Sequence, residues 1–109
     1  MCNYKILTEN SGGFIVQCLD CEHIQLGFGT SLINFTEEDY FDFHLQARDL
    51  LKRTNKVKNK KEKCIYLNTF TENSRMVLSY NELTTLSEML TTASNMLVVF
   101  NLLYKKGIK

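Results

Sequence analysis

The chain has 109 residues and a formal net charge of +1, with 44% hydrophobic and 23% charged residues. This length suits one domain, and this balance is typical of a globular protein with a packed core rather than of a disordered chain. A net charge so close to zero excludes a general electrostatic attraction to nucleic acid or to anionic membranes. We therefore expect residues 1–109 to form a single domain.

No basic patch followed by an apolar run opens the sequence, so no signal peptide is predicted. The longest apolar run, residues 96–100, is far shorter than the ~20 residues of a membrane span. The expected location is therefore the cytoplasm, with no membrane contact. In that compartment the four cysteines should stay reduced, which favours metal binding or burial over disulfides.

The first third of the chain is predicted to consist of four strands. Residues 4–9 and 14–18 flank Asn-Ser-Gly-Gly at 10–13, where asparagine and glycine accept the positive φ angles of a tight hairpin. Residues 22–28 alternate between apolar and other side chains, as a half-buried strand does. Residues 32–35 form a short fourth strand after a glycine turn.

A first helix is predicted to start at Thr36, which can cap it, and the three acids that follow suit the positive end of a helix dipole. The helix should end near Arg53. Its core face is expected to consist of Tyr40, Phe43, His44, Ala47, Leu50 and Leu51.

The second half of the chain repeats this order of elements. Residues 55–63 form a lysine-rich connector, and residues 64–70 and 75–78 are predicted strands. Ser79 and Glu82 form a capping box that opens the longest helix, which Gly107 should end. Its core stripe is Leu83, Leu86, Leu90, Ala93, Leu97, Phe100 and Tyr104.

A shift of 43 residues aligns Cys21 with Cys64 and Thr36 with Ser79, so each half would hold one unit of strand, strand and helix. An internal duplication and a chance likeness both explain this match. The predicted class is α+β: two strands, then two strand-strand-helix units. We expect one antiparallel sheet of five to six strands with both helices packed on one face.

A structural zinc site is predicted at the N-terminal hairpin. Pairing of the first two strands should gather Cys2, Cys18 and Cys21 at one end of the sheet, with His23 beside them. Three thiolates and an imidazole suit tetrahedral zinc. Against this, the chain has one Cys-x-x-Cys motif rather than two, and no small residues in it. Reduced buried thiols and a disulfide or redox pair are the alternatives.

The end of the long helix is predicted to bind a protein partner or a second copy of the chain, because its apolar arc is wider than one sheet face needs. The expected partner surface is Met89, Met96, Val99, Leu102 and Leu103. The leading interpretation is a non-catalytic protein-interaction or regulatory domain that carries the structural zinc at its N-terminal hairpin.

Two other functions stay open. The lysines of residues 52–63 could contact phosphates, but with no aromatic residue between them, and no arginine after Arg53, they offer no base recognition. A thiol-dependent enzyme would need a Cys-His pair such as Cys64 with His44, and no surrounding motif supports one.

The Cys-x-x-Cys turn, the strand His-Ile-Gln-Leu-Gly-Phe-Gly-Thr and the Leu-Ser-Tyr-Asn-Glu-Leu opening of the second helix carry a resemblance. Together they resemble a family of small uncharacterised proteins from Bacteroidetes-type bacteria. The likeness runs from about residue 13 to residue 97. The resemblance implies a bacterial, cytosolic origin, and it carries no catalytic residue over.

Overall fold

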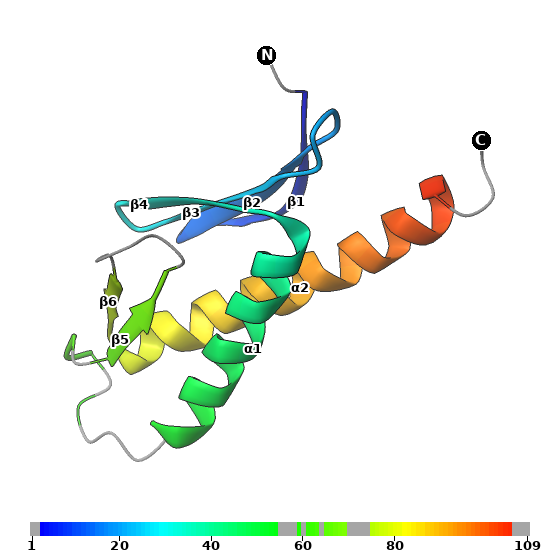
Figure 1. Cartoon of the computed structure of the whole chain (residues 1–109). Helices are drawn as coiled ribbons and strands as arrows, with labels where there is room; N and C mark the ends of the chain where they lie inside the picture. Colours follow the sequence, from blue (N-terminus) through cyan, green and yellow to red (C-terminus); the bar gives the residue numbers. More distant parts are fainter. Residues whose placement is uncertain (1–2, 55–58, 60, 64, 70–74, 106–109) are drawn as a thin grey trace.

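The structure is a computed structural model, and it describes residues 3–54, 59, 61–63, 65–69 and 75–105 (Figure 1). The chain is α+β and follows the predicted order of two strands and then two strand-strand-helix units. Its elements are β1 (Tyr4–Asn10), β2 (Gly13–Cys18), β3 (Ile24–Phe28), β4 (Ser31–Phe35), α1 (Glu37–Arg53), β5 (Ile65–Asn68), β6 (Arg75–Leu78) and α2 (Tyr80–Lys105).

The strands form two sheets, so the prediction of one sheet with five to six strands is wrong. Strands β1 to β4 make a four-stranded antiparallel sheet in chain order, and β5 pairs only with β6. The second hairpin is short, with four residues in each strand. It packs by its side chains, β5 against α1 and β6 against α2, rather than by hydrogen bonds to the first sheet. Internal duplication stays a prediction.

The first hairpin closes at the predicted turn, although none of residues 10–13 adopts the positive φ angle that was expected there. The Asn10 side-chain oxygen accepts hydrogen bonds from the backbone N–H groups of Gly12 (2.7 Å) and Gly13 (3.1 Å). Glycine is required at Gly13, because a Cβ there would collide with the carbonyl of Gly27 on β3. The β1–β2 register shifts between Ile6 and Thr8, which leaves Leu7 as a bulged residue whose side chain is buried.

Both helices lie on the same side of the four-stranded sheet (Figure 1). Helix α2 packs against β1 and β2, α1 packs against β4, and the two helices contact each other. One core results. The sheet contributes Ile15, Ile24, Leu26, Phe28, Ile33 and Phe35, α1 contributes Tyr40, Phe43 and Ala47, and α2 contributes Leu83, Leu86, Met89, Leu90, Ala93 and Leu97.

Both predicted helix starts are confirmed by their caps. The Thr36 hydroxyl accepts from the N–H of Asp39 at 3.1 Å. At α2 the box is reciprocal: Ser79 Oγ accepts from Glu82 N–H at 3.1 Å, and Glu82 Oε1 accepts from Ser79 N–H at 2.9 Å. The backbone bond from Ser79 lowers the pKa of Glu82 below its ordinary value. These local bonds fix where each helix leaves its hairpin.

Helix α2 has 26 residues, and its last turns run beyond the sheet (Figure 1). Near that end, Lys5 Nζ of β1 lies 3.1 Å from the ring centroid of Phe100. By length and composition alone, Tyr80–Leu103 could cross a membrane. Core helices of soluble proteins meet the same criterion, so this is weak evidence for a span.

Candidate functional site

A cluster of buried polar side chains joins the two helices. The Tyr40 hydroxyl donates to the Leu90 carbonyl at 2.6 Å, and Ser94 Oγ donates to the Tyr40 oxygen at 3.3 Å. Ser94 Oγ also lies 2.9 Å from His44 Nδ1, and His44 Nε2 lies 3.2 Å from Thr91 Oγ1. Every buried side-chain nitrogen and oxygen of the described residues has a hydrogen-bond partner. The cluster therefore satisfies its own polar groups.

Two of the bonds in this cluster fix the place of a proton. Because the Ser94 hydrogen points to Tyr40, the Ser94 oxygen accepts from His44 Nδ1–H. The single Thr91 hydroxyl hydrogen has two acceptors within reach, Nε2 of the neutral ring and the Ser87 carbonyl. Burial, with a smaller effect of the Arg48 charge, lowers the pKa of His44. Burial raises the pKa of Tyr40 to about 12, against the opposing bond from Ser94. Neutral forms of both rings are therefore favoured inside the fold.

The Ser94–His44 distance is that of a nucleophile and its general base, but the rest of the arrangement is not catalytic. Both side chains are 8% exposed, which leaves a substrate no access to the serine oxygen. The second ring nitrogen meets the hydroxyl of Thr91, whereas a catalytic base has a third group that stabilises its imidazolium. Cys64, the predicted thiol partner of His44, lies outside the described residues.

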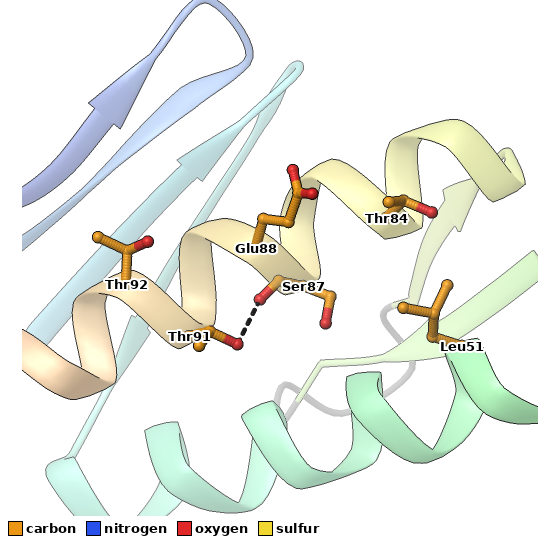
Figure 2. A pocket seen from close by; sticks show the side chains of 6 residues that line it. All are labelled: Leu51, Thr84, Ser87, Glu88, Thr91 and Thr92. Carbon is orange, nitrogen blue, oxygen red and sulfur yellow. Dashed lines mark hydrogen bonds between the residues drawn. The ribbon is translucent and has the colours of Figure 1, made fainter.

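A shallow groove of about 380 Å³ lies beside this cluster, between α2 and the end of α1. Figure 2 shows its lining residues, which are Leu51, Thr84, Ser87, Glu88, Thr91 and Thr92. Its volume is within the range of ligand sites. However, Thr84 already donates its hydroxyl hydrogen to the Tyr80 carbonyl. The Thr91 hydroxyl lies 3.0 Å from the Ser87 carbonyl, which is its acceptor inside the groove (Figure 2). The groove thus offers few hydrogen-bond donors to a ligand.

The Cys-x-x-Cys motif forms a tight turn after β2. The backbone N–H of Cys21 points at Cys18 Sγ (3.4 Å), and the N–H of Glu22 donates to the Cys18 carbonyl (2.9 Å). The turn closes when the Cys18 N–H donates to the His23 carbonyl, also at 2.9 Å. Glu22 adopts φ +66°, a left-handed conformation that favours glycine. A backbone donor is thereby aimed at a sulfur without the small residues that such turns usually carry.

Cys18 is one half of a disulfide, so the expectation that all four cysteines stay reduced is wrong for this residue. Zinc binds thiolates, and a disulfide sulfur is not one. Cys21 and His23 line a surface hollow with Glu37, while Cys2 lies outside the described residues. Within the described part of the chain, no three His, Cys, Asp or Glu side chains are placed to hold a metal. The zinc site of Cys2, Cys18, Cys21 and His23 stays a prediction.

The predicted partner surface divides between the core and the solvent. Met89 is 2% exposed, so its assignment to that surface is wrong: it faces inward on the stripe that also carries Leu86 and Ala93. Met96 is half-buried against the core. Val99 and Leu102, with Leu103, are exposed at the end of α2.

These exposed residues belong to a continuous apolar group on the last turns of α2. The exposed fractions are 52% for Val98, 46% for Val99, 55% for Leu102 and 44% for Leu103. We call these four residues the apolar helix end. Val98 belongs to the same apolar arc of the sequence and extends the listed partner surface by one residue.

A model of DUF6686, a family of unknown function, matches residues 1–108. The chain belongs to this family. No curated protein and no solved structure is significantly similar to it. The match therefore supports the resemblance found in the sequence as far as a family of unknown function, and it assigns no activity to any residue of this DUF6686 chain.

The lysine-rich segment of this DUF6686 protein falls largely outside the described residues, which include Asn59 and residues 61–63. Of these, Lys63 bonds to Glu82 at 3.1 Å.

The interhelical partners Thr91 and Ser94 were not predicted. Ser94 lies one residue after Ala93 of the predicted core stripe, and Ser94 and Thr91 lie three residues apart on α2, which is the spacing of side chains on one helix face.

Proposed function

We propose that this protein is a non-catalytic interaction domain and that it associates with a second copy of itself through the apolar helix end. The observation that carries this proposal is a change of character along one face of α2. The exposed residues of that face are polar in its middle, at Glu88, Thr91, Thr92 and Asn95. They become Val98, Val99, Leu102 and Leu103 at its end.

The change occurs at equivalent positions of the helix. Val99 lies seven residues after Thr92, and Leu102 lies seven residues after Asn95, so each pair points in nearly the same direction. Two turns earlier the same solvent-facing positions carry threonine and asparagine, so contact with water alone does not explain valine and leucine here. Four apolar neighbours on a protruding helix form the kind of patch that marks a contact surface.

A second copy is the partner that the patch fits best. The patch contains no ionisable group, so it has no charge pattern with which to select an acidic or a basic partner. An apolar patch is complementary to itself, and two-fold symmetric dimers are the commonest protein assemblies.

Sedimentation velocity of the full chain over a range of concentrations tests this proposal. The wild type should shift from the 12.7 kDa monomer to a species of twice that mass as its concentration rises. Val99→Glu with Leu102→Glu should stay monomeric, because two carboxylates cannot be buried in an apolar contact. The matched control, Thr92→Glu with Asn95→Glu, should dimerise like the wild type.

Three outcomes would contradict the proposal. One is a wild type that stays monomeric at the highest concentration, and another is a control pair that disrupts the dimer as much as the test pair. The third is binding to vesicles of neutral and anionic phospholipid that the test pair abolishes while the wild type shows no dimer. That last result would assign the helix end to a lipid surface. Circular dichroism of each variant checks that it is folded.

A further inference from the structure

We infer that the apolar helix end of one copy docks on the outer face of the four-stranded sheet of the second copy, and that the second copy's helix end docks on the first in return. This inference rests on the proposed self-association and identifies the surface that receives the helix.

The outer face of the sheet carries apolar side chains on β1, β2 and β4 and has no described helix or strand over it (Figure 1). Both helices lie on the other side, and several side chains that alternate outward meet solvent. Tyr4 is 51% exposed and Ile6 is 58% exposed on β1, and Leu32 is 59% exposed on β4. Strand pairing places Val16 of β2, which its neighbours cover, opposite Ile6 on the same face.

The same face is flat where a helix would lie. Phe14 of β2 pairs with Gly27 of β3, and Gly27 pairs in turn with Leu32. A Cβ on Gly27 would collide with the ring of Phe14, so the ring lies directly over the glycine. An aromatic ring resting on a glycine makes a smooth apolar floor between Ile6 and Leu32. We call Tyr4, Ile6, Phe14, Val16 and Leu32 the outer-sheet patch.

Polar side chains mark the border of this patch. Glu9 is exposed on β1 opposite Phe14. Gln25 of β3 donates to Asn34 of β4 at 3.1 Å, so these two amides partner each other. A helix on the outer-sheet patch can therefore leave the amide pair at its rim, in contact with water. Polar rims around apolar centres are usual in protein interfaces.

The size of each patch decides between two modes of self-association. The apolar helix end consists of four roughly half-exposed side chains and offers a few hundred Å² at most. A stable interface buries about 800 Å² on each partner, so two helix ends packed only against each other would be too small. In the reciprocal mode each copy buries both its helix end and its outer-sheet patch, which roughly doubles the contact.

The mode of packing is also one that this chain already uses. Helix α2 packs on the inner face of β1 and β2 within one molecule, with apolar side chains of a helix laid across apolar side chains of a sheet. A second helix on the outer face would complete a helix–sheet–helix stack, which is a common way to bury both faces of a sheet.

The test combines two double variants that place glutamates on opposite sides of the proposed contact. Helix variant H is Val99→Glu with Leu102→Glu, and sheet variant S is Ile6→Glu with Leu32→Glu. Each alone should be monomeric, because in each homodimer both reciprocal contacts hold a glutamate pair. An equimolar mixture should associate, since S supplies an intact helix end and H an intact outer-sheet patch.

We expect the H–S complex to bind more weakly than the wild type, because only one of its two contacts is intact. It should bind at least about tenfold more tightly than either variant binds itself. All introduced charges have the same sign, so no new ion pair can explain this rescue. Asn34→Glu, on the amide border, is the matched control for the sheet and should dimerise like the wild type.

The results separate the inference from the proposed function. If H is monomeric while S dimerises like the wild type, or if the mixture fails to associate, the sheet is not the receiving surface and self-association through the helix end still stands. A monomeric wild type overturns both. Cooperative thermal unfolding of S confirms that its strands remain folded, and Leu32→Glu alone gives a milder variant if it does not.

Discussion

The two ends of α2 differ in which of their faces are apolar. From Leu83 to Ala93 the helix buries one apolar stripe in the core and presents polar residues to solvent. From Val98 to Leu103 its solvent face is itself apolar. The first region has the pattern of a helix whose partners all lie within the chain. The second has the pattern of a helix whose partner lies outside the chain, and among the described residues no packing contact covers these four side chains.

The largest expected contrast between these regions concerns stability. Leu86→Ala should lower the free energy of unfolding by about 2–5 kcal/mol, because it leaves a cavity at a fully buried position. Leu102→Ala should lower it by less than about 0.5 kcal/mol in dilute protein. Urea unfolding monitored by circular dichroism gives both values. Equal losses would show that the end of α2 is part of the core.

A smaller effect is expected where α1 crosses the middle of α2. Tyr40→Phe removes the 2.6 Å bond to the Leu90 carbonyl and takes the acceptor from Ser94. Leaving buried groups without partners should lower the free energy of unfolding by about 1–3 kcal/mol. Tyr66, which is 60% exposed on β5, provides the control, and Tyr66→Phe should have no measurable effect. If Tyr40→Phe left the free energy of unfolding unchanged, a water molecule would have replaced the hydroxyl.

The start of α2 should respond to loss of its cap. Ser79→Ala removes the acceptor for the Glu82 N–H, and the expected loss of unfolding free energy is about 1 kcal/mol. Thr92→Ala, at an exposed position in the same helix, should change the free energy of unfolding by at most about 0.5 kcal/mol. If Ser79→Ala leaves the free energy of unfolding unchanged in the urea titration, packing of Leu83 and Leu86 alone stabilises the first turn.

The smallest effect is a dependence of stability on pH. The pKa of His44 is lower in the folded chain than its ordinary value of 6.5, so the unfolded chain takes up the proton first. Stability from this group is complete above pH 6.5 and is lost as the pH falls through the folded pKa. The slope should stay below the ~1.4 kcal/mol per pH unit of one full proton.

Urea titrations between pH 7.5 and pH 5 measure this slope. His44→Gln should flatten it, while His23→Gln, at an exposed position, should leave it in place. An unchanged slope in His44→Gln would assign the acid sensitivity to carboxylates instead.

Local signals in the sequence predicted the fold well. The Asn10 hairpin, the Thr36 cap and the Ser79–Glu82 box depend on neighbouring residues only, and all three form as predicted. The choice of strand partners depends on distant groups. Nothing within β5 or β6 reveals that the hairpin packs on the helices and leaves the edge of β4 unextended.

The candidate site was predicted only in part. Met89 and Leu102 lie 13 residues apart, which places them about 140° from each other around the helix. Helical periodicity could therefore have separated the buried Met89 from the exposed Leu102. The sequence could not show that Cys18 enters a disulfide, because the pairing of sulfurs depends on their distance in the folded chain.

The bulge at Leu7 has a consequence for how copies of this chain can meet. It interrupts the regular ladder of β1, the strand at the open margin of the sheet, and sharpens its local twist. A second molecule therefore finds no straight row of amides on which to add its own strand, so end-to-end growth into fibres is discouraged. At this edge, contacts between copies are left to side chains, which favours a closed pair over an open-ended stack.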